Sequence, residues 1–279
     1  MKTRLWPALV LVATASLCST AVAPPVAAAT DLLPDLKMAP IYDLSLQHAG
    51  NGKVRLRFGS VVWNIGQGPL EARGTNRVKR RMTDIRQVIY ASDGTTRSVT
   101  PPGVFGFYAG DGHNHWHLSN FVLTTLFPIT TDPTPPAPTD VRRLRKIGFC
   151  LLDSLRVPPE VRPPNSAARR TYRVAGCRTL HSRHFKMGIS VGFADEYPAS
   201  IAYQWINVTG LPAGDYRLCA TPNPAGAWQE VSLANNSAWV DIHLDVGADL
   251  LTMLGQGEAE CQPAPTVTPG AAALSARGS

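Results

Sequence analysis

Alternation of apolar and polar side chains, broken at short intervals by turn residues, constrains the fold of this chain more than any other feature. After Asn235-Asn236, one stretch carries apolar residues at every second position: Ala238, Val240, Ile242 and Leu244. Because a β-strand sends alternate side chains to opposite faces, this pattern predicts a strand with one buried face. The stretch from Lys53 to Trp63 has a similar pattern and predicts a second strand.

Turn signals separate such stretches, and long helical periodicity is absent. The run from Asn64 to Pro69 ends the strand that begins near Lys53. Asp93-Gly94 is a turn dipeptide that joins Gln87–Ala91 to Arg97–Thr100 in a predicted hairpin. Short strands with frequent turns are typical of sandwiches, so we predict an all-β fold: an antiparallel β-sandwich with long loops and little helix.

The first 29 residues have the composition of a secretory signal peptide. Lys2 and Arg4 give a positive start, an apolar run extends from Leu9 to Val22, and small residues lead to a cleavage site after Ala29. We therefore expect the protein to be exported, that is, secreted. Removal of 29 of 279 residues leaves 250, and the loss of two basic residues changes the formal net charge from +7 to +5.

A mature chain of this length is ordinary for a single all-β domain, which we place at residues 30–247. Residues 248–279 are rich in Gly, Ala, Pro and Thr, and we expect a flexible tail except where Cys261 holds it. No stretch after the signal peptide is long and apolar enough to predict a membrane span. The basic residues are scattered and not interleaved with aromatic residues, which argues against a nucleic-acid partner.

Four cysteines remain after the signal peptide: Cys150, Cys177, Cys219 and Cys261. In an exported protein this even number indicates two disulfides, for which three pairings exist. The pairing with short loops joins Cys150 to Cys177 and Cys219 to Cys261, and we predict it on that ground alone. A cysteine-containing metal site is the competing use, but no pair has close ligand spacing.

Three of the seven histidines, His113, His115 and His117, occupy alternate positions between Asp111 and Phe121. On a strand their imidazoles share one face, and such a strand is expected to continue into Phe121–Phe127. A metal ion about 2.0–2.1 Å from each ring nitrogen is a physical reason for three imidazoles to converge. Imidazole suits zinc, copper, iron and nickel alike, so the pattern predicts a metal site without naming the metal. The alternative is a polar strand face that carries histidines by chance.

The middle of the chain predicts two loops and one strand. Thr130–Pro138 is rich in Pro and Thr, and Arg156–Ala168 is a long Pro-rich stretch, so both are expected to be loops. A loop as long as the second is often functional or mobile. Between them, Lys146–Leu152 alternates apolar residues with others and predicts a strand.

Several sequence blocks, in order, resemble those of the lysyl oxidase family in its compact microbial form. The blocks are Leu33–Leu36, Leu56–Phe58, Asn64–Glu71, the histidine triplet, Lys146–Ser154, Asp195–Tyr197 and Gln204–Ile206. Each block alone is weak, but the ordered set is specific and extends over essentially the whole mature domain.

This resemblance implies an exported copper-dependent amine oxidase of the protein-lysine 6-oxidase type. Copper would bind His113, His115 and His117, and copper with dioxygen would convert Lys146 and Tyr197 into the cofactor lysine tyrosylquinone. The quinone carbonyl condenses with a primary amine, which is a lysine side chain or a small amine. The products are an aldehyde, hydrogen peroxide and ammonia.

Other residues of the implied site also have ordinary structural interpretations. Asp195, two residues before Tyr197, is the candidate base; the alternative is an ordinary turn or surface carboxylate. His181 and His184 are further candidates for a base or for support of the copper site; the alternative is that both are plain surface histidines. The chain departs from the animal enzymes of the family, because Ala109–Gly112 stands where those enzymes carry a cysteine and an extra histidine.

Two other classes of function remain open at this point. One is a non-catalytic copper- or zinc-binding β-sandwich, and the other is an interaction module with a vestigial site. Lys146 and Tyr197 separate the enzyme from both, because a metal carrier has no use for that pair. The positive net charge does not attract a cationic amine, so any attraction is expected to be local, for example from Asp195 and Glu196.

Overall fold

The computed structural model describes residues 28–76, 81–108, 114–130, 140–258 and 261. Within them the chain forms strands in antiparallel pairs and a single turn of 3-10 helix, η1 (Val174–Cys177). The predicted all-β, antiparallel class is confirmed. No helix of the described residues is long and apolar enough to cross a membrane.

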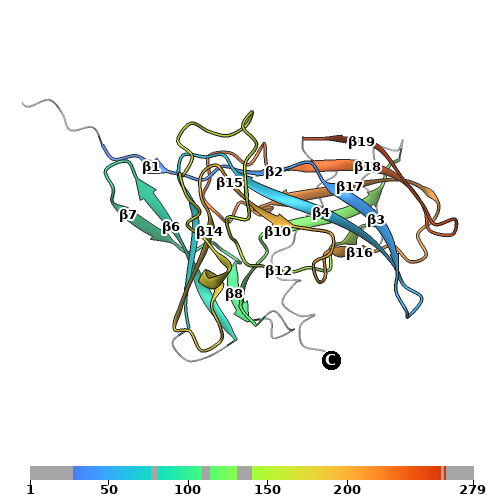
Figure 1. Ribbon diagram of the computed structural model, residues 1–279, viewed down its shortest axis with the longest axis horizontal. Helices are drawn as coiled ribbons and strands as arrows, with labels where there is room; N and C mark the ends of the chain where they lie inside the picture. Colours follow the sequence, from blue (N-terminus) through green and yellow to red (C-terminus); the bar gives the residue numbers. More distant parts are fainter. Residues whose placement is uncertain (1–27, 77–80, 109–113, 131–139, 259–260, 262–279) are drawn as a thin grey trace, which may run out of the picture.

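Three sheets organise the described chain (Figure 1). The first has the order β12-β9-β8-β6-β5-β14, with β1 and β7 also paired to β6. Its strands are β1 (Asp31–Leu32), β5 (Leu70–Thr75), β6 (Met82–Ala91), β7 (Thr96–Val99), β8 (Phe105–Tyr108), β9 (Trp116–Ser119), β12 (Gly148–Phe149) and β14 (His184–Ile189).

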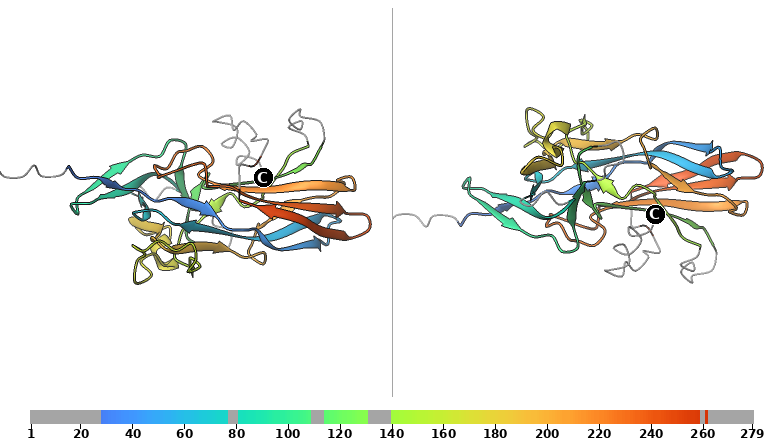
Figure 2. Two further views of the ribbon diagram at one scale, coloured as in Figure 1. Left: turned by 90° about the horizontal axis from the view of Figure 1, so that it is seen from above. Right: turned by 90° about the horizontal axis from the view of Figure 1, so that it is seen from below.

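The other two sheets form the two layers of the sandwich. One has the order β11-β10-β17-β18-β19, from β10 (Val122–Pro128), β11 (Arg142–Arg143), β17 (Gly214–Pro222), β18 (Ala238–Asp245) and β19 (Leu250–Gly257). The other is centred on β4 and contains β2 (Leu36–Met38), β3 (Tyr42–His48), β4 (Val54–Asn64), β13 (Leu155–Arg156), β15 (Phe193–Tyr197) and β16 (Trp205–Asn207). Figure 2 shows β17, β18 and β19 lying over β3 and β4.

The apolar faces of these layers form one core. Alternate residues of β18 are buried as predicted, and so are Leu56 and Phe58 of β4. All of them belong to the same cluster of buried side chains, together with Leu218 of β17. Burial of each such side chain contributes about 1.5–3 kcal/mol relative to exposure. The predicted hairpin at Asp93-Gly94 is also confirmed, as β6 and β7.

The histidine segment differs from the predicted continuous strand. Asn114 has φ 23° and β9 begins at Trp116, so His115 precedes the strand and only His117 lies on it. His113 lies outside the described residues. Asn120 has φ 54°, which ends β9, and the chain then enters β10 in a different sheet. Asparagine tolerates this left-handed conformation better than most residues, which explains both interruptions.

Two further expectations need correction. The strand predicted for Lys146–Leu152 is reduced to Gly148–Phe149, because only these residues pair with β9. The stretch after residue 248 is not simply a flexible tail, since Leu250–Gly257 forms β19 and pairs with β18. The loop predicted at Thr130–Pro138 lies almost wholly outside the described residues.

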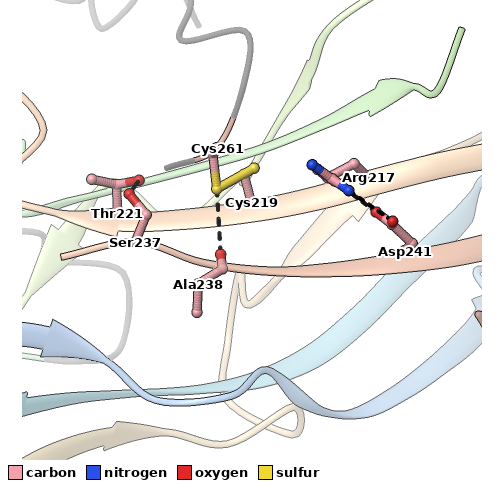
Figure 3. Close-up of a disulfide and its surroundings, with 7 residues drawn as sticks. All are labelled: Arg217, Cys219, Thr221, Ser237, Ala238, Asp241 and Cys261. Atoms are coloured by element: carbon pink, nitrogen blue, oxygen red, sulfur yellow. Dashed lines mark hydrogen bonds and ion pairs between the residues drawn. A yellow bond between two sulfur atoms is a disulfide. The ribbon is translucent and has the colours of Figure 1, made fainter. Parts of the chain in front are cut away.

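Both predicted disulfides are confirmed. Cys150 joins Cys177, with Cα atoms 6.0 Å apart, and Cys219 joins Cys261, with Cα atoms 5.8 Å apart. The second fastens Cys261 to β17 beside the ion pair of Arg217 and Asp241 (Figure 3). The first connects the end of η1 to the residue after β12, and its 27-residue separation corresponds to about 3.5 kcal/mol of loop-closure entropy.

Candidate active site

Lys146 and Tyr197, 51 positions apart, lie together in the folded chain. The Lys146 Nζ atom is 5.2 Å from the centre of the Tyr197 ring and 5.6 Å from the centre of the Phe149 ring. The two rings meet edge to face with centroids 5.1 Å apart. The lysine is 8% exposed and the tyrosine 4% exposed, so the amine is held against the aromatic face in a largely dry setting.

Backbone pairing on both sides of the lysine fixes its position. Upstream, the Arg145 N–H donates to the Trp205 carbonyl at 3.0 Å. Downstream, Gly148 and Phe149 pair with β9, the strand that carries His117. Tyr197 ends β15, where its backbone is in register with Ser60 of β4. The lysine and tyrosine segments are therefore held by strands of two different sheets.

Asp195 lies on the same face of β15 as Tyr197. The Tyr197 hydroxyl donates to Asp195 Oδ2 at 2.5 Å, and the Ser154 hydroxyl donates to Asp195 Oδ1 at 3.2 Å. Ser154 Oγ in turn accepts the Glu196 N–H at 3.1 Å. The carboxylate is buried and oriented by both hydroxyls, which rules out the surface interpretation of Asp195.

Burial is the main cause of the pKa shifts of Asp195 and Tyr197. It raises the pKa of Asp195 to about 8, although the hydrogen bonds from Tyr197 and Ser154 and the charge of Lys146 all lower it. Burial and the neighbouring carboxylate also raise the pKa of the Tyr197 phenol well above its usual value. A carboxyl group with a pKa near neutrality can both accept and donate a proton, as a general acid–base group must.

Glu196 points to the other face of β15. Its Oε1 atom accepts a hydrogen bond of 2.6 Å from the Tyr42 hydroxyl, and burial together with this contact raises the pKa of Tyr42. Since Asp195 is buried and Glu196 faces away from it, β15 does not offer the pair of surface carboxylates that we expected to attract a cationic amine.

The two described histidines of the triplet lie side by side. The ring centroids of His115 and His117 are 4.4 Å apart, and His117 stacks on Phe107 with centroids 5.6 Å apart. Two imidazoles at this separation fit a shared ion bound at about 2.0–2.1 Å from each nitrogen. The described residues contain no group of three metal-binding side chains, and His113, the expected third ligand, lies outside them.

Gly148 lets the lysine segment pack closely against the histidine pair, a role that the residue pattern does not indicate. A Cβ atom at this position would lie 2.5 Å from the Phe107 ring and 2.9 Å from His117 Cβ. Only glycine allows β12 to approach β9 this closely. A glycine inside a predicted strand is the signal that could have revealed the contact.

His181 and His184 are both exposed. His184 lies on β14, where its Nδ1 atom is 3.3 Å from Thr75 Oγ1, and no described contact joins it to Lys146 or Tyr197. His181 is in the turn after Thr179, a residue that borders the same hollow as His115. Neither is placed as a base for the Lys146–Tyr197 pair.

The fold and site define an all-β protein in which a buried lysine amine faces a buried tyrosine ring, next to the strand that carries His117. The lysyl oxidase family model matches residues 113–252, half of the chain, and the protein belongs to this family. The family consists of copper amine oxidases, oxidoreductases that act on amines with copper and lysine tyrosylquinone. A comparison with curated proteins found no match.

Proposed function

We propose that this protein is an exported, copper-dependent amine oxidase that builds lysine tyrosylquinone from Lys146 and Tyr197. The observation that carries the proposal is the 5.2 Å separation between the Lys146 amine and the Tyr197 ring. Copper would bind His113, His115 and His117. Primary amines, as peptidyl lysine or small amines, and dioxygen are the substrates.

A structural explanation of the contact also exists, because an ammonium group over an aromatic ring is a cation–π interaction worth about 0.5–2 kcal/mol. Two features favour the cofactor. Lys146 faces the ring of Tyr197, whose hydroxyl donates a hydrogen bond to the buried Asp195. The segment that holds Lys146 also packs directly on His117. A purely structural cation–π pair needs neither an acid–base group nor a metal ligand beside it.

When formed, the copper and quinone centre would supply the carbonyl and the redox capacity that convert an amine and dioxygen into an aldehyde, ammonia and hydrogen peroxide, with water consumed. The chain's own residues have four tasks. Lys146 presents its Nζ atom to the tyrosine ring, and Phe149 shields that atom from water. In its ionised form Asp195 accepts the phenolic proton of Tyr197 and passes it on to water, and it later accepts a proton from the substrate carbon next to the amine. Ser154 holds the Asp195 carboxylate in the orientation that both transfers need.

Export is proposed on two grounds. Met1–Ala29 has the composition of a signal peptide, and the two disulfides are typical of an oxidising compartment.

Phenylhydrazine titration of copper-loaded, aerated protein tests the function. We expect one carbonyl group to react per chain and peroxide release from primary amines to stop when it has reacted. Lys146→Arg and Tyr197→Phe should each abolish carbonyl reactivity and peroxide release while one copper remains bound. If the wild-type protein binds copper but neither reacts with the reagent nor releases peroxide, the protein is instead a copper- or zinc-binding β-sandwich without catalysis.

A further inference from the structure

A hollow of about 420 Å³ lies between β5, β14 and the segment that includes η1. Five of the residues that line it carry basic side chains: Arg73, Arg173, Arg178, Lys186 and His184. None of the described residues that line it is acidic. We call this hollow the cationic pocket. It is separate from the contact between Lys146 and Tyr197.

One acidic side chain contacts the wall of the cationic pocket, but it is buried and already engaged. Glu71 is 1% exposed and accepts hydrogen bonds from Arg73 at 2.6 Å, Tyr172 at 2.7 Å and Tyr90 at 3.0 Å. Its negative charge therefore offsets the positive charge of Arg73, and in the described part of the chain no ion pair joins Glu71 to another basic side chain of the pocket.

Three basic side chains of the pocket remain without a compensating carboxylate in the described part of the chain: Arg173, Arg178 and Lys186. All three are exposed, and the Lys186 Nζ atom lies 5.8 Å from the centre of the Tyr172 ring. Like charges gathered in a concave surface repel one another and raise the local concentration of anions. Arginine in particular binds carboxylates with two parallel hydrogen bonds.

The cationic pocket adjoins the surface of the histidine segment. Arg178 lines both the pocket and a second hollow of about 340 Å³, which His115 also lines. The preceding residue, Cys177, is bonded to Cys150, four positions after Lys146. One disulfide therefore holds the wall of the cationic pocket against the segment that carries the proposed cofactor lysine.

The charges of the protein give a bare cationic amine no electrostatic advantage. The formal net charge is +7 for the full sequence and +5 without the expected signal peptide, the Asp195 carboxyl is buried, and Glu196 accepts a hydrogen bond from Tyr42. A substrate that carries its own negative charges next to the amine escapes this repulsion and gains attraction from the pocket.

We propose that the cationic pocket binds glutamate or aspartate side chains of a peptide substrate, so that the enzyme selects lysines in acidic sequences. The selection of lysines for oxidation rests on the proposed amine oxidase function, whereas the binding of acidic peptide does not.

Binding is measured first, without any oxidation. The probe is a fluorescent peptide rich in glutamate in which norleucine replaces the single lysine, and the signal is its anisotropy with copper-loaded protein. We expect saturable binding that weakens as salt increases. Arg173→Gln with Lys186→Gln should weaken it about tenfold.

The control removes the same two charges elsewhere. Lys53→Gln with Arg143→Gln alters one lysine and one arginine that are exposed and lie outside the pocket, and should leave affinity within about twofold. A matched peptide with glutamine in place of glutamate should not bind measurably at the same concentrations. Equal losses in both double variants, or equal binding of the two peptides, would overturn the proposal.

Competition identifies the source of the anion. Tripolyphosphate should displace the acidic peptide only at concentrations where chloride of equal ionic strength does so. Much stronger displacement by tripolyphosphate would contradict a carboxylate site and assign the pocket to a phosphate-bearing partner.

Kinetics then test selection. With lysine peptides flanked by glutamate or by glutamine, peroxide release should show a KM about tenfold lower for the acidic peptide and similar kcat values. Arg173→Gln with Lys186→Gln should remove this difference in KM. If no peptide is oxidised but the acidic probe binds as expected, the amine oxidase proposal fails and the anion site stands. If oxidation occurs without a preference, the anion site fails alone.

Discussion

Gly148→Ala tests whether the close packing of β12 on β9 organises the candidate site. The added Cβ would lie 2.5 Å from the Phe107 ring and 2.9 Å from His117 Cβ, whereas carbon atoms prefer separations of about 3.5–4.0 Å. One strand must therefore shift by about 1 Å. His117 Cβ is attached directly to the backbone, so it cannot move aside as a flexible side chain can.

The expected change in the free energy of unfolding follows from this overlap. Overpacking in a well-packed region costs about 1–3 kcal/mol, while replacing glycine by alanine recovers about 0.4–1 kcal/mol through the unfolded state. We expect a net loss of about 1–2 kcal/mol in the free energy of unfolding. For a domain of this size the loss corresponds to a fall in Tm of about 2–8 °C.

The assay is thermal unfolding by circular dichroism, together with copper titration of the folded protein. Gly255→Ala is the matched control, because a Cβ there has no atom within 4 Å, and its Tm should be unchanged or slightly raised. Copper affinity should fall in Gly148→Ala and not in Gly255→Ala. Equal Tm values and equal copper affinities for the two variants would refute the inference that Gly148 positions the histidine pair.

Two further predictions concern stability. Because burial raises the pKa of Asp195 to about 8, the folded chain holds a proton that the unfolded chain releases near pH 4. The free energy of unfolding should therefore fall as pH rises from about 4 through 8, and Asp195→Asn should reduce this fall in urea titrations of copper-free protein. A variant with an unchanged pH dependence would contradict the burial argument. Replacing Cys150 and Cys177 together by serine should reduce the free energy of unfolding by about 3.5 kcal/mol, measured the same way. A loss below about 1 kcal/mol would show that the loop is already ordered in the unfolded chain.

Strands with regular alternation were predictable from the sequence. Val54, Leu56 and Phe58, and the residues from Ala238 to Leu244, have a period of two because one face of each stretch packs into the core, and the structure has them in β4 and β18. From Phe58 onward both faces of β4 are buried. β19 was missed because several of its apolar residues, such as Met253 and Leu254, are exposed, so that no period of burial marks the strand.

The candidate site was less predictable from residue patterns alone. No local pattern reports that Lys146 and Tyr197 meet across 51 positions, and only the family resemblance pointed to the pair. The break of the histidine strand depends on the positive φ of Asn114 and Asn120, which a pattern of alternate histidines does not reveal. The contact of Gly148 with His117 likewise arises from strand pairing between distant segments.

Peptide mapping tests most directly whether Lys146 and Tyr197 become one covalent unit. Copper-loaded, aerated protein is denatured, reduced, alkylated and digested, and the peptides are identified by mass spectrometry. We expect the separate peptides with Lys146 and Tyr197 to disappear and a single branched peptide containing both to take their place. Lys146→Arg protein should instead yield the unmodified Tyr197 peptide. Recovery of both peptides, separate and unmodified, from copper-loaded, aerated wild-type protein would contradict this expectation.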